Sequence, residues 1–501
     1  MEDTLSNAPT RASSPKGAPK DDLARAFRTA LPEMALLAMG EREFEEERAR
    51  CWNKDVIHKP GAIVQPTTTA EVCAVVKLAR ERGDRLVIAG GRHGHDCMAD
   101  DALVLDLSKM TSVSVDAPNA LVTVEGGCRL GDMDSACQEH GLAVVTGTNP
   151  DTGVVGLSIH GGAGYLSRQH GLAVDNFHSA ELVLASGEVV VASRDNEHAE
   201  LLWGISGGGS NFGVVTKLTM RAHPVGKVFG GMVINVALST KTAAAIVGNW
   251  RDWILSAPRS VGGAAVLPCG APVVPMVIVE TDKNAVPQRD GARTSISRVP
   301  SLRAALSGCG AFGACVSVKL FKTMHYHTEM QSLLESLQRS GHYFGASLIV
   351  PELSDEVVAT LVHATRNDHP NSEAAVGIFP LNGAVSDAPL SSTAFHGGRG
   401  AISLQRPPRA FWIIVEAKFT PDEKGANRAK AVAWSKELYS RLRQFNISET
   451  AHTLDGNMEE TMRGVGEIFG PNESRLRQVK AAYDPNNFFR CNRNIEPVKS
   501  K

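Results

Sequence analysis

The chain has 501 residues, 43% of them hydrophobic and 21% charged, which is ordinary globular composition and enough length for two domains with separate cores. A formal net charge of −2, without a long run of one sign, argues against a nucleic-acid partner and against a basic membrane-binding patch. The nine cysteines are odd in number, scattered and lack any CxxC pair. We interpret them as reduced thiols and expect neither a disulfide framework nor a zinc ribbon.

The first 40 residues are expected to form a disordered lead-in. The opening segment, MEDTLSNAPTRASSPKGAPK, is polar and rich in Pro and Ser, and it lacks the apolar core of a secretion signal. No stretch of the chain reaches the apolar length of a membrane span. These features predict a cytoplasmic protein that does not enter a membrane.

Helices and short strands alternate over residues 41–223. After a charged helix at 41–50, Thr68 is placed to cap a helix that runs to Arg82, and Glu71 to complete its capping box. The apolar run at 85–89 then predicts a buried strand. Further strands are expected at 103–107, 113–115, 121–124, 143–146 and 180–185, with a helix at 130–140 and a turn at Ser186-Gly187.

The composition changes after about Pro224, where few glycine motifs remain. Strand-like runs at 230–238, 275–280, 315–321 and 411–418 alternate with amphipathic helices at 241–256, 328–340, 355–367 and 426–444. We predict an α+β protein with a cofactor-binding domain over 41–223 and a substrate domain over 224–445, whose antiparallel sheet is covered by helices. Residues 446–501 are expected to return to the first domain.

Two glycine-rich loops, AGGRHGH at 89–95 and IHGGAGY at 159–165, lack side chains where the backbone must approach another group. Their free N–H groups suit a pyrophosphate. Neither loop fits GxGxxG, so a Rossmann fingerprint is not supported. Glycine alone leaves a structural turn and a phosphate cradle equally open.

Two other motifs suggest different chemistry. The HGHDC run at 93–97 resembles a metal cluster, but alternate residues on one short loop supply at most two or three ligands, so we expect no metal. Residues 204–208 match the nucleophile elbow GxSxG, yet they follow a helix-like stretch instead of a strand. We interpret that match as accidental.

In combination, the segments resemble the berberine-bridge-enzyme-like branch of the FAD-linked oxidases, which share the vanillyl-alcohol oxidase fold with its two-part, PCMH-type FAD-binding domain. The resemblance covers most of the chain. It is carried by QPTTTAEVCAVVKLARERG, AGGRHGH, LVLDLSKM, TGVVGLSIHGGAGYLSRQHGLAVDN, LLWGISGGGSNFGVV and YDPNNFFRCNRNI.

The resemblance implies that FAD is attached covalently through its 8α-methyl to His93, which closes the run Gly90-Gly91-Arg92-His93. Arg92 replaces the family's third glycine, so the loop departs from the usual pattern. His95 is the reserve attachment point, and a loop histidine bonded to backbone is the alternative. Many members add a second bond from a cysteine, but Asn149 occupies that position, which implies a single bond.

Other FAD-binding positions follow from the matched motifs. His160 stands where the family often has glycine, and it is either an unusual active-site group or a packed histidine. The implied set is Gly90, Gly91, Arg92, Gly94, His95, Thr148, Thr152, Gly153, Val154, Gly156, Leu157, His160, Gly161, Gly162, Gly164, Tyr165, Leu172, Val214, Val215, Asn492 and Asn494.

The family's usual catalytic tyrosine is missing. It belongs to a Tyr-x-Asn-Tyr/Phe-x-Asp segment, and the corresponding stretch here, 450–455, has neither aromatic residue. Either another residue takes the substrate proton or the substrate needs no strong base. The candidates for the base are His452, Tyr326, Tyr343, Glu416 and His396.

The resemblance implies an oxidase that passes hydride from a small organic substrate to FAD and uses dioxygen as acceptor, releasing hydrogen peroxide. We expect the substrate to be a bacterial secondary metabolite. Thr152 matches the family's oxygen gate and is close in shape to the permissive valine, which favours an oxidase. The alternatives are a dehydrogenase or cyclase that reacts slowly with oxygen, and a protein that sequesters a small molecule without turnover. The sequence does not indicate an oligomeric state.

Overall fold

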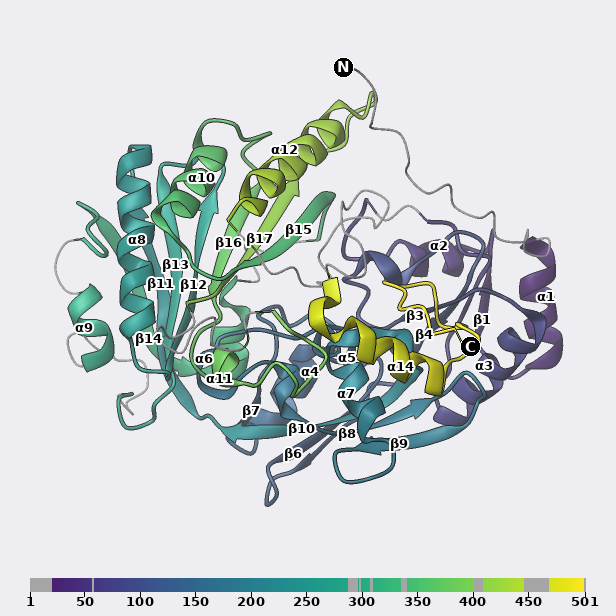
Figure 1. The fold of residues 1–501 in the computed structure, drawn as a ribbon. Helices are drawn as coiled ribbons and strands as arrows, with labels where there is room; N and C mark the ends of the chain where they lie inside the picture. Colours follow the sequence, from purple (N-terminus) through teal and green to yellow (C-terminus); the bar gives the residue numbers. More distant parts are fainter. Residues whose placement is uncertain are drawn as a thin grey trace.

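The computed structural model describes residues 20–55, 58–286, 296, 299–306, 310–334, 340–397, 399, 409–445 and 468–499. Within these residues the chain forms sheets of four, six and seven strands, arranged in two lobes (Figure 1). The two smaller sheets use the chain up to Pro224, and the largest uses strands between Lys227 and Lys418. The protein is therefore α+β, as the sequence predicts.

The four-stranded sheet has the order β1-β2-β4-β3 and is parallel except for β1. Its strands are β1 (Leu36–Ala38), β2 (Ala62–Val64), β3 (Leu86–Ala89) and β4 (Leu103–Asp106). Helix α3 (Thr69–Arg82) connects β2 to β3, and the predicted capping box between Thr68 and Glu71 is present. The helix ends at Gly83, whose φ of 74° is a left-handed conformation that glycine adopts without strain.

The six-stranded sheet is antiparallel and has the order β5-β6-β10-β8-β9, with β7 paired to β10. Its strands are β5 (Val113–Asp116), β6 (Leu121–Glu125), β7 (Leu142–Val144), β8 (Phe177–Val183), β9 (Val189–Ser193) and β10 (Val214–Pro224). The associated helices are α4 (Leu130–Gln138), α5 (Val154–Ser158), α6 (Ser167–His170) and α7 (Ala199–Gly208). Ser206 lies within α7 and donates a hydrogen bond to the Leu202 carbonyl, so no nucleophile elbow forms there.

The seven-stranded antiparallel sheet has the order β14-β11-β13-β12-β16-β17-β15. Its strands are β11 (Lys227–Val236), β12 (Val261–Pro268), β13 (Val273–Glu280), β14 (Ser317–His325), β15 (Tyr343–Val350), β16 (Ala375–Pro380) and β17 (Phe411–Lys418). Three long helices, α8 (Thr240–Ser256), α10 (Asp355–Arg366) and α12 (Ala426–Arg443), cover one face (Figure 1). The apolar core of this lobe lies between that face and the helices.

The other face of the large sheet packs against the N-terminal lobe. Because side chains alternate along a strand, Leu348 faces the helices, whereas its neighbour Ile349 joins the core of the six-stranded sheet. On β17, Trp412 and Ile414 likewise join the core of the six-stranded sheet. The buried guanidinium of Arg168 also bridges the lobes, since it donates to the carbonyls of Ala257, Pro258 and Val261 and to Asn382.

The C-terminal helix α14 (Glu473–Tyr483) and the tail after it lie on the N-terminal lobe (Figure 1). Lys480 is 0% exposed, and its Nζ donates to Asp484 Oδ2 at 2.7 Å and to the carbonyls of Asn211 at 2.6 Å and Phe489 at 2.9 Å. These bonds satisfy the buried ammonium and hold the tail beside the start of β10.

Two expectations about local structure were wrong. The lead-in is ordered from Lys20 onward, because α1 (Lys20–Ala30) buries Phe27 and β1 pairs with β2. The helix predicted at 328–340 is instead a π-helical turn (Tyr326–Met330) followed by a 3₁₀ turn (Gln331–Leu334). Tertiary contacts accompany these turns: His327 donates to the Leu142 carbonyl, and Gln331 donates to Asp134 and to the Gly147 carbonyl.

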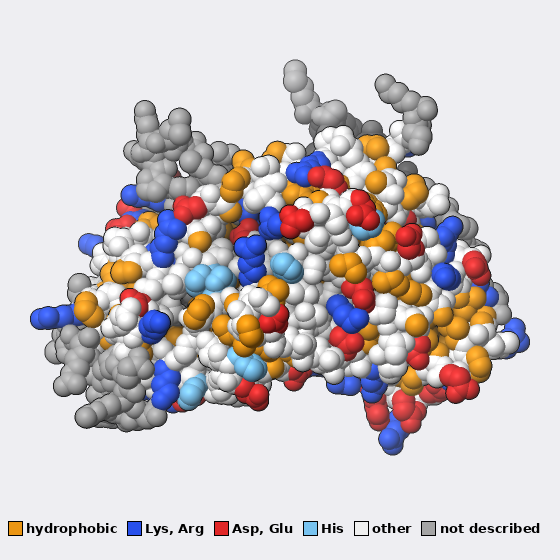
Figure 2. All heavy atoms as spheres, turned by 90° about the horizontal axis from the view of Figure 1, so that it is seen from below, with side chains coloured by type: hydrophobic (Ala, Val, Ile, Leu, Met, Phe, Trp, Pro, Cys, Tyr) orange, Lys and Arg blue, Asp and Glu red, His pale blue; other side chains and the backbone are white. Residues whose placement is uncertain are grey.

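Lys and Arg side chains alternate with Asp and Glu over the described part of the surface that Figure 2 presents. That face therefore carries no continuous basic area of the kind that binds a phosphate backbone. Among the described helices, none is long and apolar enough to cross a membrane.

Candidate functional site

A cavity of about 990 Å³ lies among three segments of the N-terminal lobe: the loop after β3, the segment around α5, and the C-terminal tail. Both glycine-rich loops contribute to it. Its lining residues are Ile88, Gly90, Gly91, Arg92, His93, Gly94, His95, Asp96, Cys97, Leu107, Gly126, Thr152, Gly153, Val155, Gly156, Leu157, Ile159, His160, Ser210, Val215, Cys491, Asn492 and Arg493.

Part of the cavity wall is built by direct backbone contact between Gly91 and Gly153. A Cβ added to Gly91 would lie 2.1 Å from the Gly153 nitrogen, and one added to Gly153 would lie 2.5 Å from the Gly91 nitrogen. Both distances are shorter than van der Waals contact, so only glycine allows the two loops to touch. The contact brings the segment that contains His93 next to the one that contains Thr152.

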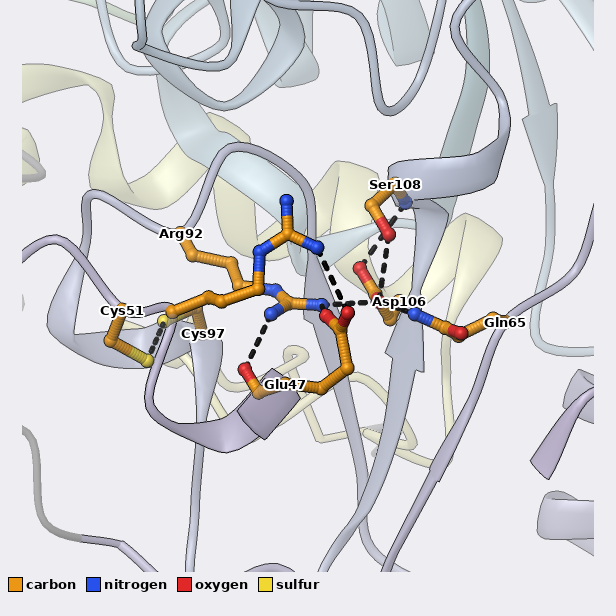
Figure 3. A network of polar contacts seen from close by, with 8 residues as sticks. Glu47, Cys51, Gln65, Arg92, Cys97, Asp106 and Ser108 are labelled. Atoms are coloured by element: carbon orange, nitrogen blue, oxygen red, sulfur yellow. Dashed lines mark hydrogen bonds and ion pairs between the residues drawn. The ribbon is translucent and has the colours of Figure 1, made fainter. Parts of the chain in front are cut away.

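Arg92 stands where the family pattern has its third glycine. Its φ of 60° is a left-handed conformation, which glycine adopts more readily than other residues. Although Arg92 borders the cavity, its guanidinium is bound in a buried polar network (Figure 3). It pairs with Asp106 and, at 2.8 Å, with Glu47. Burial opposes the charge, but these two carboxylates raise the pKa of Arg92 above its ordinary value.

Asp106 anchors this network, which we call the Arg92 network. Its carboxylate is 0% exposed and also accepts hydrogen bonds from Gln65 Nε2 at 2.7 Å and from Ser108 Oγ at 2.8 Å (Figure 3). The strand β4 therefore fixes the side chain of Arg92, and through it the backbone that presents His93.

His93 is 7% exposed and borders the cavity. Its Nδ1 lies 3.4 Å from Thr152 Oγ1, while its Nε2 is buried and has no hydrogen-bond partner among the described residues. Burial, with a smaller contribution from Arg129, lowers the pKa of His93 to about 3. The imidazole is thus neutral at physiological pH, which is the state a nucleophilic attachment requires.

His95 lies on the same loop but is engaged elsewhere. Its Nε2 is 2.7 Å from Asn53 Nδ2, and Asn53 also donates to the Tyr343 carbonyl at 2.9 Å. The side chain of Asn53 thereby connects the loop to β15 of the other lobe. This arrangement gives His95 a structural role at the lobe interface.

His160 borders the main cavity and also a second, smaller one of about 260 Å³. Its Nδ1 is 2.7 Å from the Gly156 carbonyl. Burial lowers the pKa of His160, although the bond to Gly156 acts in the opposite direction. Because a carbonyl can only accept, Nδ1 carries the proton of the neutral ring and Nε2 carries the lone pair.

The second cavity lies where the two lobes meet. His160 is the one titratable side chain among its lining residues, which otherwise are aliphatic, aromatic or glycine. They are His160, Gly162, Ala163, Leu172, Ile349, Leu381, Phe395 and Trp412. Ile349 and Trp412 belong to the large sheet. The remaining lining residues come from segments of both lobes that connect helices and strands.

Several residues implied by the family pattern border neither cavity: Thr148, Val154, Gly161, Gly164, Tyr165, Val214 and Asn494. Val154 is fully buried in the core, and Val214 points to the opposite face of β10 from Val215. The position of Gly164 has no room for a side chain, because a Cβ there would lie only 2.0 Å from the Thr146 carbonyl oxygen. Asn149 is nearly buried, and its Oδ1 accepts the Asp151 N–H at 3.0 Å.

None of the described base candidates borders either cavity. Tyr326 is buried in an apolar cluster, and Tyr343 is buried beside Asn53. Burial raises the pKa of Glu416 and of both tyrosines, and it raises those of Tyr326 and Tyr343 well above the ordinary value of a phenol. His396 lies next to Phe395, but its Nε2 is 3.0 Å from the Ile468 carbonyl. His452 lies outside the described residues.

Other residues of the cavity wall were not predicted from the sequence, including Asp96, Cys97, Gly126, Ser210 and Arg493. The Gly126-Gly127 pair could have indicated a place of close backbone approach, because a side chain at Gly126 would meet Leu107 and the Val215 carbonyl. Ser210 and Arg493 sit in segments that were already matched, and Asp96 and Cys97 directly follow one, but which side chain faces the cavity depends on the tertiary fold.

The residues present fit a flavin dinucleotide. Among the described residues, His93 Nε2 and Asn492 Oδ1 are buried without a hydrogen-bond partner, and both residues line the cavity. Glycines provide the backbone access that a pyrophosphate requires.

Comparisons with known proteins agree with this fit. Residues 60–193 match the family described as "FAD binding domain", and residues 457–496 match "Berberine and berberine like". A FAD-linked oxidoreductase of Dictyostelium discoideum is 27% identical over 92% of this chain and 94% of its own length. The (R)-6-hydroxynicotine oxidase of Paenarthrobacter nicotinovorans is 27% identical over 90% of this chain and 94% of its own.

Solved structures share the fold. A BBE-like protein of Physcomitrella patens superposes with a TM-score of 0.77 at 21% identity, covering 95% of this chain and 100% of its own. A chitooligosaccharide oxidase superposes with a TM-score of 0.76 at 21% identity, with the same coverage of 95% and 100%. The fold thus occurs in proteins whose names indicate different substrates, and the substrate must be inferred from the site itself.

Proposed function

Because the chain belongs to the berberine-bridge-enzyme-like FAD-linked oxidoreductases, we propose that it is an oxidase of a small, largely apolar molecule and that His93 holds its FAD covalently. When bound, FAD supplies a two-electron acceptor that takes hydride from the substrate and passes the electrons to dioxygen, giving hydrogen peroxide. The observation that carries the proposal is the buried, unbonded Nε2 of His93 in a glycine-walled cavity.

We propose a single covalent bond, formed by His93. His93 is neutral and is held against Trp52, with ring centroids 4.3 Å apart, so the imidazole is preorganised. His95 is less suitable because its Nε2 already contacts Asn53. Asn149 has no nucleophilic sulfur and turns its Oδ1 toward its own loop, which supports attachment at one position only.

The second cavity is the proposed substrate site. It adjoins the main cavity through His160 and is lined mainly by apolar side chains. A sugar buried there would leave most of its hydroxyls without partners, which costs about 1–3 kcal/mol for each unpaired group. The lining therefore favours a small aromatic or cyclic amine metabolite, of the kind named for the nicotine oxidase relative, over an oligosaccharide. We retain a secondary metabolite as the substrate class.

We propose His160 as the proton acceptor for the substrate. It lies at the boundary of the two cavities, where a substrate and a flavin would meet. The bond from Nδ1 to the Gly156 carbonyl fixes the tautomer, so that Nε2 is free to take a proton from a hydroxyl or amine. His160 replaces the missing tyrosine in this proposal, because the described candidates from the sequence lie away from both cavities.

Dioxygen is the proposed acceptor, since Thr152 borders the main cavity beside His93. A dehydrogenase with slow oxygen reactivity is the second candidate. A cytoplasmic location is also proposed, because the eight described cysteines are all free thiols, as expected in a reducing compartment.

The attachment is tested by acid precipitation of the purified protein and spectroscopy of the pellet. We expect a yellow pellet and one FAD-sized mass increment, both lost in His93→Ala and retained in His95→Ala. A pellet that stays yellow in His93→Ala and loses its colour in His95→Ala would assign the bond to His95. A colourless wild-type pellet would contradict covalent attachment.

Turnover is tested by flavin bleaching. The probes are phenols and cyclic amines, including (R)-6-hydroxynicotine, set against chitooligosaccharides. We expect anaerobic bleaching by members of the first group only, with oxygen-dependent recovery. Bleaching without rapid recovery would favour the dehydrogenase, and tight binding without bleaching across both groups would reject both enzymatic functions.

A further inference from the structure

Cys51 and Cys97 form a close thiol pair at the wall of the main cavity. Their sulfurs are 3.7 Å apart, although the residues are 46 positions apart in the sequence. Cys51 follows helix α2 (Arg42–Arg48), and Cys97 ends the loop that contains His93 and itself borders the cavity. Figure 3 shows both cysteines beside Arg92.

The surroundings of the pair favour reaction. The hydrogen bond with Cys97 is the main reason that the pKa of Cys51 is lowered, and the positive charge of Arg92 contributes. The buried thiols of Cys128 and Cys137 differ, because burial raises the pKa of each to about 12. The same hydrogen bond, together with burial, raises the pKa of Cys97 well above its ordinary value. Cys51 is therefore the member of the pair that more readily forms the nucleophilic thiolate.

The geometry also permits a bond. A disulfide requires a sulfur–sulfur distance of about 2.05 Å, so the two sulfurs must approach by about 1.6 Å from their present 3.7 Å. Cys491 borders the same cavity and packs on the same apolar cluster, which makes it the competing partner of Cys97.

We propose that Cys51 and Cys97 are a peroxide-sensitive pair that closes to a reversible disulfide when hydrogen peroxide enters the cavity. The natural source of that peroxide rests on the proposed oxidase function, whereas the reaction of the pair does not. Closure links the loop that presents His93 to the end of α2, and so restrains the segment next to the flavin site.

The reaction balances with peroxide as the oxidant. The thiolate of the pair attacks one peroxide oxygen, the O–O bond breaks, and the departing hydroxide takes up a proton to form water. The second thiol then attacks the sulfenic acid, the S–S bond forms, and a second water leaves. Two thiols are oxidised, one hydrogen peroxide is reduced to two waters, and a thiol reductant reverses the bond.

The test uses the purified full-length holoprotein, first reduced and then freed of reductant. It is treated with a small molar excess of hydrogen peroxide, free thiols are alkylated, and the unreduced digest is analysed by mass spectrometry. We expect a Cys51–Cys97 cross-linked peptide that disappears after dithiothreitol. Cys51→Ser and Cys97→Ser should each abolish it, and Cys128→Ser should leave it unchanged.

Three outcomes would overturn the proposal: alkylation of both cysteines after peroxide treatment, irreversible oxidation of Cys97, and a cross-link between Cys97 and Cys491. Having two separate serine variants keeps the test decisive if one of them folds poorly. Because peroxide is added, the result is independent of substrate turnover. A protein that forms the cross-link but never reduces its flavin would retain this proposal while rejecting the oxidase.

Discussion

The imidazole of His93 lies nearly parallel to the indole of Trp52, with ring centroids 4.3 Å apart and an angle of 17° between the planes. Trp52 belongs to the segment before β2, so this stack joins the loop that contains His93 to a part of the chain 41 positions earlier. Nε2 of this imidazole has no partner among the described residues, and His93 lines the cavity.

We therefore predict that Trp52→Ala lowers the fraction of covalently bound flavin several-fold, because the imidazole loses the surface that orients it. Trp52→Phe keeps an aromatic face and should retain most of the attachment. The measurement is the flavin absorbance of acid-precipitated protein, relative to protein mass. Equal attachment in both variants would show that the stack does not orient His93.

The Arg92 network should contribute strongly to stability. Arg92→Ala leaves the fully buried carboxylate of Asp106 without its charge partner, and we expect a loss of about 3–5 kcal/mol in the free energy of unfolding. Removing the charge as well, in Arg92→Ala with Asp106→Asn, should recover part of that loss. Urea unfolding of both variants and of Asp106→Asn measures the coupling. Additive losses would contradict a direct interaction.

The activity should depend on pH through His160. Burial lowers the pKa of this imidazole, so the base is neutral at pH 7 and becomes protonated only below its ordinary value of 6.5. We expect kcat/KM to fall on the acid side of that value. His160→Gln should lower kcat/KM by about 10²–10⁴ and remove this acid limb, with the flavin content unchanged. If His160→Gln retained the wild-type acid limb, another group would have to be the base.

Stability should also depend on pH, through His223. Burial is the main reason that the folded-state pKa of His223 is lowered to about 4, and His170, stacked on it at 3.7 Å, and Arg221 contribute. The unfolded chain binds the proton more readily, so stability is fully present above pH 6.5 and is lost as pH falls toward 4.

His223→Gln retains a donor for the Asn176 Oδ1 bond and should reduce the dependence in that window. His140→Gln, at an exposed histidine, is the control variant. Urea midpoints at about pH 7.5 and about pH 5 provide the comparison. An equal pH effect in wild type and His223→Gln would exclude this histidine as the cause.

The second cavity is tested by adding volume to its wall. Ile349→Phe should raise KM for a bleaching substrate by about tenfold while leaving the flavin spectrum unchanged, because the larger ring narrows this cavity. Leu348→Phe is the matched control, since its side chain faces the helix-covered core. It should lower stability by about 1–3 kcal/mol without changing KM. Similar KM values in the two variants would place the substrate elsewhere.

Local sequence patterns predicted the elements with strong local signals. The capping box at Thr68 and Glu71, the helix α10 and the strand β17 were all expected close to their observed bounds. The glycine run before His93 likewise indicated a place of close backbone approach, and the structure places it against Gly153. These features depend on residues near one another in the chain, so their patterns carry the information.

Some strands of the large sheet were harder to recognise. β12, β15 and β16 were not predicted, and their short apolar runs do not distinguish a strand from other buried segments. The turns at Tyr326–Met330 and Gln331–Leu334 replaced an expected α-helix, since polar contacts with Asp134, Leu142 and Gly147 bind them to the other lobe. Such contacts are invisible in a local pattern.

The sequence alone determined that the chain carries the glycine loops and the histidine of a flavin-binding family, because those motifs are contiguous. The tertiary structure decided which side chains reach the cavity. It directs Arg92 into a buried ion pair, engages His95 with Asn53 and brings His160 to both cavities. The direction and burial of each of these side chains are set by segments distant in the chain. The proposed base, His160, could therefore be identified only in the folded structure.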